Sequence, residues 1–120
     1  EADPQTSLGE PGISPQDQTY RVTRYANVHD GDIIIGLKIQ VEVLEDPSYT
    51  SGYRIVGIPS AVKVVSYPQN LVEHIFDDAT LSSIKIFPDK QSASFTATVK
   101  IQYLHSTKYT SVPLLGTVDL

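Results

Sequence analysis

Residues 32–45, DIIIGLKIQVEVLE, decide the fold class of this chain of 120 residues. Apolar and polar side chains alternate along the stretch, with Lys38, Gln40 and Glu42 placed between large aliphatic residues. Successive side chains of a β-strand point to opposite faces, whereas an α-helix repeats every 3.6 residues. The stretch therefore predicts a strand with one buried face, made of Ile33, Ile35, Leu37, Ile39, Val41 and Val43.

Residues 91–105, QSASFTATVKIQYLH, alternate in the same way and predict a second long strand. Weaker alternation occurs in TYRVTRYANV, YRIVGI, AVKVVSY, LSSIKIF and YTSVPLLGTV. About seven strands in a chain of this length are typical of an antiparallel β-sandwich or a small barrel. We therefore predict an all-β fold in which residues 19–120 form a single domain. Because both long strands exceed the usual strand length, we expect a bend or a bulge, for which Gly36 is a suitable position.

Residues 70–78, NLVEHIFDD, break the alternation. The apolar residues at helical spacing are Leu71, Val72, Ile75 and Phe76. Asn70 is a residue type that caps helix N-termini, so the pattern predicts one short helix. A strand with Leu71, Glu73 and Ile75 on one face is the alternative.

Asp30 and Gly31 form a dipeptide that supplies the positive φ angles of a tight hairpin turn between two strands. His29 and Asp32 flank this turn, and their spacing matches neither an EF-hand loop nor an H-E-x-x-H pair. We therefore predict a turn and no metal site. A weak calcium site remains the alternative, shared with loop carboxylates drawn from Glu45, Asp46, Asp77 and Asp78.

Residues 1–18, EADPQTSLGEPGISPQDQ, differ in composition from the rest of the chain. They contain four acidic residues, three prolines and no Lys or Arg, and their apolar residues have no period. Such a segment cannot recover its ordering entropy by burial, so we predict a flexible acidic tail or linker. The tail carries most of the net charge of −5. The remainder is nearly neutral and lacks a basic stripe, so we expect no nucleic-acid or membrane partner.

The chain contains no cysteine and no methionine, and it begins with Glu1. Without cysteine, it has no disulfide, no thiolate metal site and no cysteine nucleophile. Removal of an initiator methionine does not expose glutamate, so we expect that the chain was cut from a precursor or from a larger protein. Signal-peptide cleavage would produce this end, and we therefore expect a secreted, extracellular protein. A boundary chosen within a longer protein explains Glu1 equally well.

Catalytic residues are not predicted. His29, His74 and His105 lie on an expected turn, an expected helix and a strand end, without a G-x-S-x-G motif or a glycine-rich phosphate loop in the sequence. Polar residues on turns and strand ends explain these positions without a reaction. We therefore expect no enzymatic activity and no cofactor.

Tyrosine is the dominant aromatic residue, with seven Tyr against three Phe and no Trp. Tyrosine suits a binding surface because its ring is apolar and its hydroxyl is polar, although it equally suits the margin of a β-sandwich core. Tyr49 and Tyr53 lie in the turn-rich stretch EDPSYTSGY, and Tyr109 lies beside the turn HSTK. Loops carry function more often than scaffolds do, so these three tyrosines are the predicted binding residues.

The favoured interpretation is a secreted, non-enzymatic recognition module that binds a protein or glycan partner through loops of a β-sandwich. The first alternative is a structural or assembly protein of a matrix, fibre or coat, which would self-associate by pairing of strand edges. The second alternative is a carrier that encloses a hydrophobic ligand in a barrel.

Overall fold

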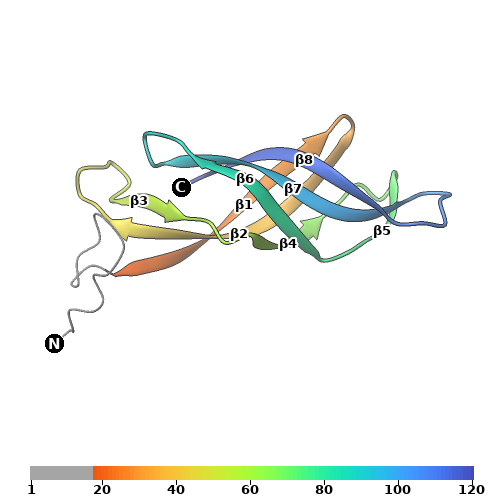
Figure 1. Cartoon of the computed structure of the whole chain (residues 1–120), viewed down its shortest axis with the longest axis horizontal. Helices are drawn as coiled ribbons and strands as arrows, with labels where there is room; N and C mark the ends of the chain where they lie inside the picture. Colours follow the sequence, from red (N-terminus) through yellow and green to blue (C-terminus); the bar gives the residue numbers. More distant parts are fainter. Residues whose placement is uncertain (1–17) are drawn as a thin grey trace.

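The computed structural model describes residues 18–120, so the predicted acidic tail lies outside the described residues except for Gln18. The described residues form eight β-strands, and no helix occurs among them (Figure 1). In chain order the strands are β1 (Thr19–Asp30), β2 (Ile33–Glu45), β3 (Tyr53–Gly57), β4 (Ala61–Ser66), β5 (Val72–Ile75), β6 (Asp78–Ile86), β7 (Ser92–Tyr103) and β8 (Thr110–Asp119). The all-β prediction is confirmed, with β5 as an additional strand.

Six of the strands close into an antiparallel barrel. The closed path runs β1-β8-β7-β6-β4-β2 and returns to β1, because β1 pairs with both β2 and β8. The other two strands extend the sheet, since β3 pairs with β2 and β5 pairs with β7. The sequence predicted an antiparallel β-sandwich or a small barrel, and the observed structure is the small barrel.

The long strands β2 and β7 organise the barrel because each pairs with three neighbours. β2 runs along β1 on one edge, and its other edge pairs first with β4 and then with β3. β7 pairs with β8 on one edge and with β6 and β5 on the other. The expected irregularity near Gly36 is present: Gly36 pairs with Ser66 and Leu37 with Val64, which leaves Val65 as an extra residue. The bulged residue therefore lies on β4, the shorter partner.

β1 and β2 are joined by the two-residue turn Gly31-Asp32, because Asp30 pairs directly with Ile33. The φ angle of Gly31 is +62°, and Asp32 does not share a positive φ. A positive φ at the first turn position alone fits a type II′ hairpin turn, in which glycine is favoured at that position. A hairpin turn is confirmed here, but one residue later than predicted: Asp30 ends β1 without a positive φ angle, and Gly31 and Asp32 are the two central residues.

The core is built from the inner faces of the strands. The six predicted core residues of β2, from Ile33 to Val43, are at most 8% exposed. In β7 the residues Ala93, Phe95, Ala97, Val99 and Ile101 are at most 3% exposed, as the alternation predicts. Burying a large aliphatic or phenylalanine side chain contributes about 1.5–3 kcal/mol. Among residues 18–120 no polar or charged side chain is buried, so this apolar contact dominates the interior.

The predicted helix at residues 70–78 is wrong. Val72–Ile75 forms β5, which pairs antiparallel with the end of β7 and has a register shift after Val72. Val72 is 1% exposed, whereas Glu73 and His74 are exposed. The local helical spacing is overridden because the edge of β7 offers backbone partners that a helix could not use. The alternative, a strand, is the observed structure, but its buried residue is Val72, and the predicted face of Leu71, Glu73 and Ile75 contains the exposed Glu73.

The pairing between β1 and β8, which we call the seam, closes the barrel with the fewest residue pairs of any two neighbouring strands described. It consists of two pairs, Val28 with Gly116 and His29 with Leu115. A Cβ atom on Gly116 would lie 2.5 Å from Val28 Cγ1 and 3.1 Å from the carbonyl oxygen of Asn27. Real Cβ atoms do not approach that closely. Glycine is therefore required here so that the two backbones can meet.

Gly116→Ala should lower the free energy of unfolding by about 1–3 kcal/mol, because the added methyl group overpacks a contact with the fully buried Val28. Urea unfolding measures the change. Gly57→Ala is the matched control, since its new Cβ would meet the movable carboxylate of Glu42 at 2.9 Å. The control should stay within about 0.5 kcal/mol of the wild type. Equal losses in the two variants would contradict the role given to the seam.

Candidate functional site

The three predicted binding tyrosines lie in two separate places. Tyr49 belongs to the loop 46–52 between β2 and β3, and Tyr53 begins β3 directly after it. Tyr109 precedes β8, at the end of the β7–β8 connection. Figure 1 shows the loop 46–52 and the β7–β8 connection at opposite ends of the molecule. The structure therefore does not bring the three residues into one site.

The loop 46–52 is closed by its own hydrogen bonds. The backbone amide of Asp46 donates to Gly52 O at 2.8 Å, and the amide of Gly52 donates to Tyr49 O at 2.9 Å. Asp46 Oδ1 accepts hydrogen bonds from the amide of Ser48 at 3.1 Å and from its hydroxyl at 2.5 Å. Asp46 Oδ2 lies 3.2 Å from Nε of Arg54. These contacts fix the backbone on both sides of Tyr49.

Tyr53 contributes more to packing than to the surface. Its half-buried side chain packs against the apolar core. Its ring also contacts Tyr20 of β1 edge to face, with ring centroids 6.4 Å apart. A tyrosine held in this way matches the alternative considered for the tyrosines, the margin of the core.

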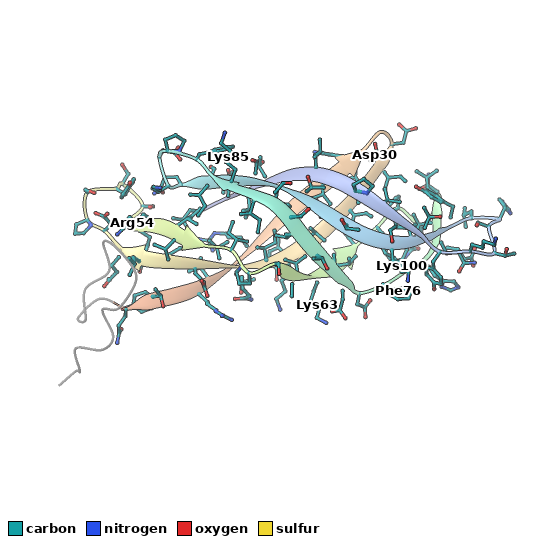
Figure 2. All side chains as sticks on the ribbon, viewed as in Figure 1. Asp30, Arg54, Lys63, Phe76, Lys85 and Lys100 are labelled. Carbon is teal, nitrogen blue, oxygen red and sulfur yellow. The ribbon has the colours of Figure 1, made fainter. Side chains whose placement is uncertain are left out.

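Tyr109 belongs to an exposed group that we call the aromatic cluster, made of Phe76, Lys100 and Tyr109. The rings of Phe76 and Tyr109 meet edge to face with centroids 4.8 Å apart. Lys100 Nζ lies 5.2 Å from the centroid of the Phe76 ring, within the range of a cation–π contact. Phe76 is 46% and Tyr109 42% exposed. Figure 2 shows Phe76 and Lys100 together, far from Arg54 at the other end.

Sequence reasoning found Tyr109 but missed Phe76 and Lys100. Phe76 was assigned to the helix, whereas it follows β5, and its amide donates to Lys100 O at 3.0 Å. On the other edge of β7, Thr110 pairs with Ile101. β7 therefore holds the two aromatic residues on either side of Lys100. Only the strand pairing reveals this neighbourhood, because the residues are distant in sequence.

A second surface feature, which we call the outer hollow, lies on the outer face of the barrel over β1, β8, β7 and β6. Its volume is about 420 Å³. Asn27 and His29 reach it from β1, where they alternate with the buried residues Ala26 and Val28. The lining residues are Asn27, His29, Ser83, Ser94, Phe95, Thr96, Leu115, Gly116 and Thr117. Phe95, which the alternation places in the core, and Gly116 line the hollow from the inward-facing side of their strands. The other lining residues carry no individual sequence signal, because each reads as the solvent face of a strand or as part of a turn.

The loop carboxylates considered for calcium do not gather in one place. Asp46 contacts Ser48 and Arg54, whereas Asp78 pairs with Lys63 on the neighbouring strand β4. Within residues 18–120, no three His, Cys, Asp or Glu side chains come close enough together to hold a metal ion. The calcium alternative therefore has no clustered ligands in the described part of the chain.

Fold and surface together define a small antiparallel β-barrel with two separate exposed features, the aromatic cluster and the outer hollow. Comparison of the chain with known protein families, curated proteins and solved structures finds no match. Across residues 18–120, no helix is both long and apolar enough to span a membrane.

The pKa of Asp46 lies below its ordinary value of 3.8, mainly because Ser48 donates two hydrogen bonds to the carboxylate and Arg54 adds its charge. A lowered pKa means that the loop 46–52 is held together above pH 3.8 and loosens as the pH falls through the folded-state value. The protection factor of the Tyr49 amide, which compares its exchange rate by NMR with that of an unfolded chain at the same pH, should therefore fall in that acid window. Asp46→Asn should exchange fast at neutral pH as well. A protection factor that stays constant across the acid window in the wild type would contradict this role.

Proposed function

We propose that this protein is a non-enzymatic recognition module that binds a protein partner through the aromatic cluster. The observation that supports the proposal is the contact between two exposed rings, Phe76 and Tyr109, beside the cation of Lys100. Exposed aromatic residues in mutual contact are typical of binding hot spots, because they bury much area and lose little side-chain entropy.

The position of the cluster supports the proposal in a second way. Lys100 lies in β7, Phe76 directly follows β5, and Tyr109 directly precedes β8. Both β5 and β8 pair with β7, so the rings are held by the barrel and not by a long loop. A surface that is already ordered loses less entropy when a partner binds. The expected role of Tyr49 stays a prediction, and so do the glycan partner and the secreted location.

The double variant Phe76→Ala, Tyr109→Ala tests the proposal. Partners would be isolated with the full chain from extracellular fluid and then measured as purified proteins by calorimetry. The double variant should weaken binding at least tenfold, since truncating a hot-spot aromatic costs about 2 kcal/mol or more.

Val65→Ala is the matched control, because Val65 is 53% exposed on β4 and lies outside the aromatic cluster. It should bind like the wild type. Tyr49→Ala tests the predicted loop site in the same assay. Equal affinity of the double variant and the wild type for every purified partner would overturn the proposal.

A second candidate function, self-association, is supported by the outer edge of β1. Residues 19–27 pair with β2 on one edge, and no described strand pairs with them on the other. An unpaired edge is a template for strand addition by another chain. Arg24 opposes this, because it lies between Val22 and Ala26 on the inward-facing side, and an inward charge is one way in which edge strands resist pairing.

Light scattering over a range of concentrations tests self-association. The full chain should form dimers or larger species, and Thr23→Lys should shift them toward monomer by adding charge at the edge. Gln40→Lys is the control, because Gln40 lies opposite Thr23 and shares a hydrogen bond with it, so the control adds the same charge and removes the same bond without placing the charge on the open edge of β1. A chain that begins at Thr19 lacks the tail, so association that persists in it is attributed to the edge of β1 and not to the tail. A monomer at every concentration would contradict this candidate.

The third interpretation, a carrier of hydrophobic ligands, lacks a comparable observation. The inner faces of the strands pack together in one apolar cluster. The space that a carrier would need for its ligand is the space that side chains such as Phe95 and Leu114 occupy.

A further inference from the structure

The outer hollow is built from strands that lie side by side in register. His29 of β1 pairs with Leu115 of β8, and Leu115 pairs with Thr96 of β7. Two residues further along these strands, side chains face outward again, and Thr117 of β8 pairs with Ser94 of β7. Adjacent strands are about 4.8 Å apart and alternate residues about 7 Å, so three strands present a grid about 10 Å wide. Because the grid is made of strands, its geometry is fixed before any ligand arrives.

The polar groups of the grid are not used by the protein. In the described part of the chain, no side-chain hydrogen bond or ion pair engages Asn27, His29, Ser94, Thr96 or Thr117. Elsewhere on the outer face, cross-strand neighbours do pair. Ser92 donates to Asp119 at 2.7 Å, and Gln40 donates to Thr23 at 2.9 Å. The side-chain polar groups that line the hollow are therefore available to a ligand.

The chemistry of these groups selects the class of ligand. Hydroxyl, amide and imidazole groups both donate and accept hydrogen bonds, as the hydroxyl groups of a sugar do. The described residues that line the hollow include no Lys, Arg, Asp or Glu, so an ionic ligand would find no opposite charge there. Lys85 pairs with Ser94 and lies at the β6 margin, outside that lining.

Apolar residues lie within the polar grid and beside it. Tyr25, which is 67% exposed, precedes Asn27 by two positions and faces the same side of β1. Leu115 is 64% exposed, and Ile34, which pairs with His29, is 50% exposed. Sugar rings present apolar C–H faces and polar edges, which match an exposed aromatic ring beside hydroxyl groups. The volume of about 420 Å³ is within the range of small-molecule sites.

We propose that the outer hollow binds a neutral oligosaccharide, with Tyr25 against a sugar ring and Asn27, His29, Thr96 and Thr117 bonded to its hydroxyl groups. This site is distinct from the aromatic cluster and does not depend on it. The sugar would lie across the β1–β8 seam and contact three strands at once.

An NMR titration of the full chain with neutral disaccharides tests the proposal, using cellobiose, maltose, lactose and chitobiose as probes. At about 10 mM, a sugar with a Kd near 1 mM occupies most of the sites. Amide signals of Asn27, His29, Thr96 and Thr117 should shift with at least one probe. Thr96→Val removes one hydroxyl group with little change of shape and should weaken binding about three- to tenfold.

Thr98→Val is the matched control, because Thr98 is exposed on the same strand but lies outside the hollow. It should titrate like the wild type, and so should the double variant Phe76→Ala, Tyr109→Ala. The absence of shifts at the hollow with all four probes would overturn the sugar site while leaving the proposed protein partner unaffected. Equal weakening by Thr96→Val and Thr98→Val would also overturn it.

Discussion

The barrel depends on the uninterrupted alternation of apolar residues along β2 and β7. Each strand has an inner face without a polar residue, so each must be covered on that face. Each is also longer than any single partner on its second edge, and two short strands share that edge. The exposed backbone groups of the long strands thus determine where the short strands lie.

Much of the fold follows from the sequence because the deciding signals are local. The period of two located seven of the strands, and the Asp30-Gly31 dipeptide located the first hairpin. The helix prediction at residues 70–78 failed because the structure of this segment depends on pairing with the edge of β7. That edge lies far away in the sequence, so a local pattern does not reveal it. The sequence did not distinguish a barrel from a β-sandwich. Closure requires β1 to pair with β8, and these strands are far apart in the sequence.

The surface was predicted less well, for the same physical reason. Tyr49 and Tyr53 were chosen as binding residues because a turn-rich loop is a local signal, and the side chain of Tyr53 packs against the core. The partner of Tyr109 in the aromatic cluster is Phe76, which is brought near by its position across β7. The outer hollow is lined mostly by polar residues that look ordinary one at a time, together with Leu115, Phe95 and Gly116. Its character arises only from register.

The two-pair seam of β1 and β8 also bears on how the chain folds. Because it joins the first and last described strands, it is the contact with the greatest loop-closure entropy to overcome, whereas the β1–β2 hairpin closes through two turn residues. We expect the hairpin to form early and the barrel to shut last. During synthesis, one edge of β1 would then stay unpaired until β8 has been made.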